Sequence, residues 1–320
     1  MSTQLVAPSA IEGELVRIWE GLEKENKLRA SLFTLVVFTK YSARTDYFRH
    51  IVQKVVEKFP CRVLFISEDT HSKQPFLKTA VSVLNGPCEQ IDIGAAGTDI
   101  EKVPSLVLAH LLPDLPITLL WAEDPSKSHP LFERLSSLAH RVIFDSECTD
   151  KLSKFAKAVL ALHQQGKDVA DLNWARTEGW RDLVASLFSS APVLKEVHIE
   201  YNDRPTEFFS HLKIQSLYLE AWFQSRLGKM KCRIDSDCWE KLGPGTIISV
   251  KLHDKTGLVY DCSRIRDRYH SVCIQIASPE KCLLPYEFML GQTASGQSLV
   301  QEICRRGTSC HYVDMLQKLC

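Results

Sequence analysis

Four uninterrupted apolar runs constrain the fold of this chain more than any other feature of its sequence. Each run is short, rich in Val, Ile, Leu and Phe, and lacks the alternation of a half-buried strand. Such runs are typical of strands that are buried on both faces of a parallel sheet. The four runs are 31–38, 61–67, 116–122 and 141–146.

Amphipathic patterns separate these runs and predict a helix between each strand and the next. Residues 79–93 predict two further short strands around a turn at 85–87. Strands that alternate with helices indicate an α/β fold, with a mostly parallel sheet covered by helices on both faces. We assign residues 1–190 to this domain. The predicted helices are 9–28, 44–58, 101–111, 124–139, 149–163 and 177–188, the fourth opened by an Asp124–Pro125 cap.

The pattern changes after residue 190. Shorter strands with hairpin-length connections predict an antiparallel sheet. We therefore assign residues 191–320 to a smaller α+β domain. Its predicted strands are 193–201, 245–252, 258–263, 270–277 and 281–286, and its predicted helices are 206–226, 296–305 and 310–319.

Charge and hydropathy exclude several classes of partner. Lys plus Arg and Asp plus Glu both number 39, so no net field attracts nucleic acid or an anionic membrane. The apolar stretch 103–122 is interrupted by His110, Pro113, Asp114 and Pro116, which argues against a membrane span. The first residues lack the features of a secretory signal. We expect a cytoplasmic protein that binds neither nucleic acid nor membrane.

The chain contains eleven cysteines but no C-x-x-C pair. Their spacing matches no standard zinc or redox motif, so we expect no metal and mostly structural thiols. Cys61, Cys273 and Cys282 lie in or beside apolar runs, as buried thiols commonly do. Thiol regulation is the alternative, and Cys320 is the thiol that we expect to be exposed.

No catalytic or cofactor motif follows the predicted strands. The sequence lacks a phosphate-binding loop, a dinucleotide fingerprint, a zinc-protease motif and a nucleophile elbow. We therefore predict no enzyme activity and no cofactor. Open parallel sheets bind ligands beyond the carboxyl ends of their strands, where Trp121 and Asp145 are expected here. An alternative function is thus a sugar-phosphate sensor or enzyme at these strand ends, with Arg141 and Asp114 contributing.

The stretch 171–188 concentrates Trp and Arg residues, which dominate protein–protein hot spots. A helix over 177–188 would place Trp180 on its apolar face. Arg176 lies four residues before Trp180 and could stack on its indole ring. We expect Arg181 to lie off the apolar stripe, as a partner contact, and Arg176 to be structural. Trp174 precedes the predicted helix.

Three segments also carry a family resemblance: "LLPDLPITLLW", "RVIFDS" and "DLNWARTEGWRDLVASLF". In this order and spacing they resemble the OpcA family of bacterial glucose-6-phosphate dehydrogenase assembly proteins. Two departures are a single Trp121 where the family usually has tandem Trp, and Thr177-Glu178-Gly179 where it usually has Leu-Thr-Pro. The second departure concerns the shape of the surface at this turn.

The resemblance implies a non-enzymatic protein that binds glucose-6-phosphate dehydrogenase and activates it, in support of the oxidative pentose phosphate pathway. The dehydrogenase is then the expected partner, while the oligomeric state of this chain stays open. The candidate partner-binding residues are Trp174, Arg176, Arg181, Trp121, Asp114, Arg141 and Asp145.

Overall fold

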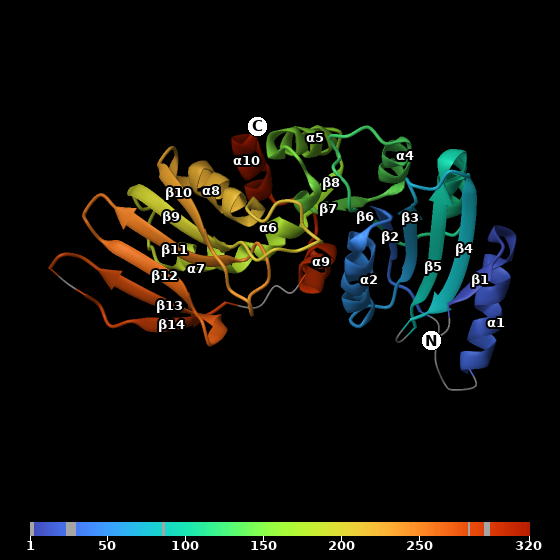
Figure 1. Cartoon of the computed structure of the whole chain (residues 1–320), viewed down its shortest axis with the longest axis horizontal. Coiled ribbons are helices and arrows are strands. Elements are labelled where there is room, and N and C mark those ends of the chain that lie inside the picture. Colours follow the sequence, from blue (N-terminus) through green and yellow to red (C-terminus); the bar gives the residue numbers. More distant parts are fainter. Residues whose placement is uncertain (1–2, 24–29, 85–86, 281, 291–294) are drawn as a thin grey trace. The chain divides into compact units, whose positions relative to one another are not determined.

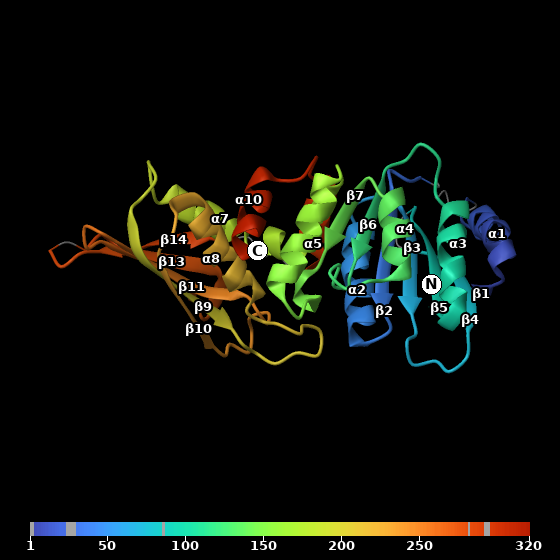
Figure 2. The same cartoon turned by 90° about the horizontal axis from the view of Figure 1, so that it is seen from above.

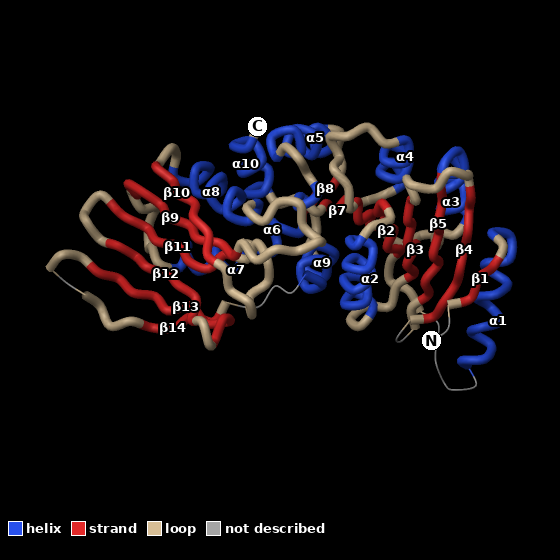
Figure 3. The backbone as a smooth tube through the Cα atoms, in the orientation of Figure 1, coloured by secondary structure: helices blue, strands red, loops and turns tan. Residues whose placement is uncertain are grey.

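The computed structural model describes the chain except for residues 1–2, 24–29, 85–86, 281 and 291–294. It divides into two compact units, each built from segments that are distant in sequence. Unit 1 consists of Met1–Asp145, Ala161–Leu172 and Ser295–Thr308, and unit 2 of Ser146–Leu160, Asn173–Ala294 and Ser309–Cys320. Each unit contains one sheet (Figures 1 and 3).

The sheet of unit 1 has eight strands in the order β1-β4-β5-β3-β2-β6-β7-β8. The six strands from β5 to β8 in this order are parallel, and β4 and β1 continue the sheet antiparallel. Taken along the chain, the parallel strands have the doubly wound order 3-2-1-4-5-6 of a Rossmann fold. The strands are β1 (Gln4–Val6), β2 (Thr34–Lys40), β3 (Arg62–Glu68), β4 (Phe76–Val83), β5 (Glu89–Ala96), β6 (Ile117–Trp121), β7 (Arg141–Phe144) and β8 (Asp168–Asp171).

Helices cover both faces of this sheet, as the sequence predicted. Leu35 and Val37 of β2 face a core that includes helices α2 and α9. Side chains alternate along a strand, so Trp121 and Phe144 point to the opposite face, where both contact Phe132 of α4. The helices of unit 1 are α1 (Ile11–Glu23), α2 (Ala43–Val56), α3 (Val103–Ala109), α4 (Pro130–Leu138), α9 (Ser295–Cys304) and the last turn of α5 (Leu152–Gln164).

Unit 2 is built on a six-stranded sheet in the order β10-β9-β11-β12-β13-β14. Its pairs are antiparallel apart from β9 and β10, which run parallel. Helix α8 packs its buried face on β9 (Figure 2). The elements are α6 (Leu172–Arg176), α7 (Glu178–Ser186), β9 (Leu194–Asn202), α8 (Ile214–Leu227), β10 (Lys231–Asp237), β11 (Ile247–Asp254), β12 (Val259–Ile265), β13 (Arg268–Ala277), β14 (Tyr286–Met289) and α10 (Cys310–Leu319).

Several predicted boundaries were wrong. The helix expected from Asp124 begins at Pro130, where the His129 ring accepts a hydrogen bond from the Leu131 N–H. Asp124 instead accepts from the Ser126 N–H in a turn. Strands β1, β8 and β10 were not predicted, and α8 begins eight residues later than expected. The ends of the predicted helix 9–28 and turn 85–87 fall partly outside the described residues.

Helix α9 belongs to unit 1 although it follows the strands of unit 2 in sequence. It contacts α2 closely, because a Cβ at Gly296 would lie 2.4 Å from the Cβ of Lys54. Its Leu299 joins the core beneath β2. The domain boundary at residue 190 stays a prediction.

The eleven cysteines are free thiols in the structure. Cys61 is buried, as predicted, and its backbone N–H donates to the sulfur of Cys88, which directly precedes β5. Cys320 is exposed, as predicted. The expectation was wrong for Cys282, which is also exposed, because it lies in a connection at the edge of the second sheet.

Candidate functional site

Two aromatic rings lie against each other near the carboxyl ends of strands β2 and β6. Phe38 of β2 and Trp121 of β6 are stacked with their ring centroids 4.1 Å apart and an interplanar angle of 9°. Trp121 is 1% exposed, and the His129 ring contacts both rings. The chain order of the strands reverses between β2 and β6, which is where a doubly wound sheet binds its ligand.

Several backbone N–H groups around this point donate hydrogen bonds to side chains of the same chain. The Lys40 N–H donates to Glu123 Oε1 at 3.1 Å. Ser42 caps helix α2, accepting from the Arg44 N–H, while the Ser42 N–H donates to Thr45 Oγ1. In a Rossmann fold the backbone N–H groups of this turn hold the cofactor pyrophosphate. Here a carboxylate and two hydroxyls take up these groups.

Asp145 lies at the same end of the sheet and is fully buried. Arg44 Nη2 donates to its Oδ2 at 3.0 Å. A buried carboxylate needs such a partner, because an unpaired charge is costly away from water. Asp145 and Trp121 therefore hold the fold together at the strand ends.

The opposite, amino-terminal end of the sheet contains a buried ion network. Arg62 donates to Glu89 at 2.7 Å, to Glu12 at 2.8 Å and to the carbonyl of His110 at 3.0 Å. The indole N–H of Trp19 also donates to Glu89. Partial burial opposes ionisation of Glu12, but hydrogen bonds from His110 and Arg62 outweigh it and hold its pKa below the ordinary value. The network anchors the loop that begins at His110.

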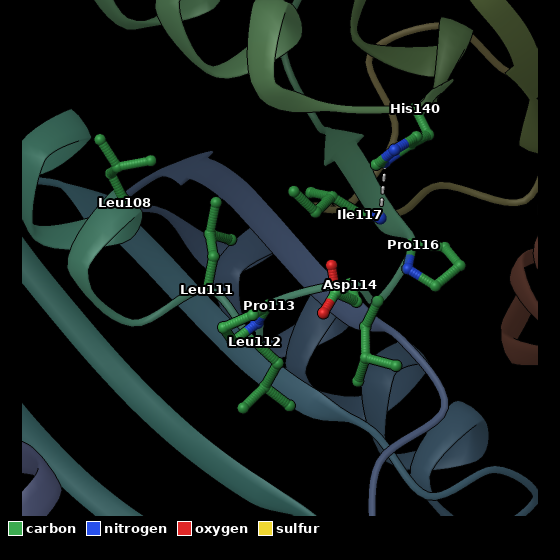
Figure 4. A pocket seen from close by; sticks show the side chains of 9 residues that line it. Leu108, Leu111, Leu112, Pro113, Asp114, Pro116, Ile117 and His140 are labelled. Atoms are coloured by element: carbon green, nitrogen blue, oxygen red, sulfur yellow. Dashed lines mark hydrogen bonds between the residues drawn. The ribbon is translucent and has the colours of Figure 1, made fainter.

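This loop, residues 111–116, forms a shallow apolar pocket of about 520 Å³ at the start of β6 (Figure 4). Asp114 is exposed and adopts a left-handed backbone conformation with φ of 62°, which Asp tolerates better than most residues. Leu108 at the rim is 59% exposed. The pocket is lined by Leu108, Leu111, Leu112, Pro113, Asp114, Leu115, Pro116, Ile117 and His140.

Arg141 lies next to this pocket in sequence but not on its surface. The preceding residue, His140, accepts a hydrogen bond from the Ile117 N–H at 3.0 Å (Figure 4). Arg141 itself is buried, and donates to Glu302 of α9 at 2.9 Å and to the Gly307 carbonyl at 3.0 Å. It joins α9 to the sheet.

The Trp/Arg stretch is arranged differently from the prediction. Trp180 is buried in the core of unit 2, as predicted. Two helices, α6 and α7, meet at Thr177, and the Arg181 guanidinium lies over the ring of Trp174. The predicted stack of Arg176 on Trp180 is wrong, because Arg176 lies over the ring of Phe209 and Arg264 lies over that of Trp180. Arg176 pairs with Glu147 at 2.9 Å. Arg181 is only 7% exposed, so its predicted place on an accessible surface was wrong as well.

Of the seven candidate residues, only Asp114 is exposed. Trp121 and Asp145 share one end of the first sheet, whereas Trp174, Arg176 and Arg181 belong to unit 2. Among the described residues, no cluster of three His, Cys, Asp or Glu side chains is placed to hold a metal ion. No helix in that part of the chain is long and apolar enough to span a membrane.

Comparison with solved structures agrees with the fold. A 3-ketoreductase from Actinomadura kijaniata, KijD10, superposes with a TM-score of 0.54 at 7% identity, covering 90% of this chain and 94% of its own. A dehydrogenase from Chromobacterium violaceum superposes with a TM-score of 0.53 at 10% identity, covering 91% and 93%. At such identities the likeness concerns the fold alone.

Sequence comparison identifies closer relatives. The OpcA proteins of Nostoc punctiforme and Synechocystis are 28% and 27% identical over 191 and 193 residues, or 55% of this chain. The match spans only 40% and 39% of the length of these relatives. Residues 52–161 match the family described as the glucose-6-phosphate dehydrogenase subunit N-terminal domain, and residues 167–315 match the corresponding C-terminal domain. The chain belongs to the OpcA family of glucose-6-phosphate dehydrogenase assembly proteins.

Proposed function

We propose that this chain is a non-enzymatic factor that binds glucose-6-phosphate dehydrogenase and promotes its active assembly. The observation that carries the proposal is that the chain's own side chains bond to one another at the carboxyl ends of β2 and β6. The Phe38–Trp121 stack and the Lys40–Glu123 hydrogen bond lie at the strand ends near which a dehydrogenase of this fold holds its dinucleotide. The choice of partner rests on the family. Both matched domains are described as domains of a glucose-6-phosphate dehydrogenase subunit, and the curated relatives are named as OxPP cycle proteins.

The physical mechanism would be linkage between binding and assembly. A protein that binds the active state of an enzyme more tightly than its inactive state shifts the population by the difference in binding free energy. The chain needs no reacting group for this, only a surface complementary to one state. We place this activity in the cytoplasm, where the enzyme's pathway operates.

The pocket around Asp114 is the contact surface that we favour in unit 1. It combines the exposed apolar side chain of Leu108 with the carboxylate of Asp114. Its loop follows His110, whose carbonyl accepts a hydrogen bond from Arg62. An interface of this kind, apolar at its centre and anchored on a rigid scaffold, is typical of protein–protein contacts. Of the buried candidates, Arg141 at the start of β7 lies at this end of the sheet and would support the surface indirectly, whereas Trp121 and Asp145 lie at the opposite end.

Co-purification with the dehydrogenase of the same organism tests the proposal directly. We expect the two proteins to elute together, and the initial rate of the dehydrogenase to rise with added chain until it saturates. Unchanged rates and unchanged sedimentation of the dehydrogenase at excess chain would refute the proposed function.

A variant of the pocket tests the surface separately. Asp114→Asn retains the side-chain shape and tolerates the left-handed backbone, while Leu108→Ser removes the apolar rim. We expect the double variant to keep its thermal stability but to need a higher concentration for half-maximal activation. Asp46→Asn, which removes an exposed carboxylate from helix α2, is the matched control.

A further inference from the structure

Four lysines of unit 2 converge on a second shallow pocket, of about 530 Å³. Lys195 belongs to β9, Lys229 and Lys231 lie at the start of β10, and Lys255 follows β11. Strand pairing brings them together, because Lys231 is the partner of Glu196 across β9 and β10. The Lys255 N–H also donates to the carbonyl of Val193 at 3.2 Å.

This lysine pocket carries surplus positive charge. Lys231 Nζ lies 3.0 Å from Glu196, whose carboxylate also attracts Lys195, whereas the described residues form no ion pair with Lys229 or Lys255. The nearby Asp254 is engaged in its own turn, where it accepts hydrogen bonds from the N–H groups of Thr256 and Leu258. The chain as a whole contains equal numbers of acidic and basic residues, so this excess of positive charge is local to the lysine pocket.

The floor of the lysine pocket is apolar. Val193 is 61% exposed there, and the side chains of Leu227 and Met230 are half-buried. Exposed apolar carbon bordered by amines gives this surface both apolar contact area and positive charge. The ligand that fits must supply both negative charge and an apolar group.

The lysine amines of this pocket suit a polypeptide ligand better than a small metabolite. Pockets for small ligands fix their occupant with a few rigidly placed polar groups. All four lysines here are exposed, with their charges on flexible stems, and the described lining residues include no arginine and no aromatic ring. Lysine acts as a point charge without a fixed direction of hydrogen bonding, which suits an acidic chain segment.

We infer that the lysine pocket docks an acidic segment of the dehydrogenase that also carries an apolar side chain, an inference that rests on the proposed function. The lysines would steer the encounter, and Val193 and Met230 would receive the apolar group. Charges at the rim of an interface act mainly on the association rate and on its salt dependence.

The test compares the intact chain with two double variants, using the dehydrogenase as the probe. Lys229→Glu with Lys255→Glu reverses the field, and Lys229→Arg with Lys255→Arg preserves it. Association rates are measured between low and high salt. We expect the reversal to slow association by about tenfold at low salt and to flatten the salt dependence, with the arginine pair unchanged.

A matched control carries the same change of charge in unit 1. Lys58→Glu with Lys73→Glu replaces two exposed lysines without a described side-chain partner, and association should stay close to that of the intact chain. Equal losses in this control and in the pocket variant would overturn the inference. So would displacement of the dehydrogenase by inorganic phosphate beyond the effect of chloride at the same ionic strength.

The two proposals fail in different ways. If the intact chain does not bind the dehydrogenase at any salt concentration, the proposed function is wrong and the docking inference falls with it. If the intact chain binds and the reversed variant binds at the same rate, only the docking inference is wrong.

Discussion

The guanidinium of Arg181 lies over the indole ring of Trp174, with its carbon 3.4 Å from the ring centroid. Its Nη1 donates to the Trp174 carbonyl at 2.7 Å and to Thr177 Oγ1 at 2.6 Å. These contacts bridge the break between α6 and α7. Arg181 thus joins two short helices inside unit 2.

Arg181→Ala should therefore destabilise the protein. Removing one member of a buried, hydrogen-bonded set leaves other polar groups without partners, and the expected loss is about 3 kcal/mol. Urea unfolding followed by tryptophan fluorescence measures it. Replacing the exposed Arg306 with Ala should change the free energy of unfolding by less than about 0.5 kcal/mol. An Arg181→Ala protein as stable as this control would contradict the structural role.

Trp180 offers a graded test of the core of unit 2. It packs among Leu183, Val184 and strand residues of the second sheet, so Trp180→Ala should cost about 3–5 kcal/mol. The indole N–H of Trp180 has no acceptor among the described residues, so Trp180→Phe loses no hydrogen bond. We expect the Phe variant to lose less than half as much stability as the Ala variant in the same unfolding experiment. Equal losses would indicate that the indole N–H is bonded.

The filled strand ends predict that the isolated chain does not bind NADP. A ligand at a hundred times its Kd stabilises a protein by about 2.7 kcal/mol, so about 1 mM NADP would reveal a Kd of about 10 μM as a rise in Tm. We expect no such rise. Purified glucose-6-phosphate dehydrogenase in the same buffer is the positive control. A clear shift for this chain alone would revive the alternative of an enzyme or sensor.

Glu12 should contribute a pH-dependent part of the stability. Its pKa is lowered from 4.5 in the folded protein, although partial burial opposes this, because His110 and Arg62 hydrogen-bond its charged form. The folded state thus favours the carboxylate, and the resulting stability is present above about pH 4.5 and is lost as pH falls through the folded pKa. Glu12→Gln should unfold more easily than the intact chain at pH 7, by about 1 kcal/mol or less for this half-exposed group. The two stability curves should converge as the pH is lowered below 4; a constant difference would count against the carboxylate.

The central strands of the first sheet could be predicted because both of their faces are buried. Each therefore reads as a continuous apolar run, whose short length and content of Val, Ile and Phe favour a strand over a buried helix. Strands β8 and β10 were missed because they are edge strands, short or rich in charge, as in the sequence "KCRIDSD" of β10. Their positions depend on pairing with a neighbour rather than on local pattern.

The candidate site residues show more clearly which features the sequence alone could not predict. The burial of Arg181 depends on α6, which precedes the predicted helix and brings the Trp174 ring against the guanidinium, and no pattern within 177–188 indicates this contact. The lysine pocket depends on pairing between segments about 60 residues apart, which leaves no signal in any short window of sequence. Asp114 differs, because its exposure follows from a local feature, a turn flanked by Pro113 and Pro116 that projects one carboxylate; its role in partner binding stays a prediction.

The return of α9 to unit 1 has a consequence for synthesis on the ribosome. Leu299 and Val300 of this helix complete the core beneath β2, and Glu302 neutralises the buried Arg141. A nascent chain therefore carries the first sheet with part of its apolar face open to water while almost all of the second sheet is translated. Closure of that core awaits residues 295–308, which are translated after the strands of the second sheet.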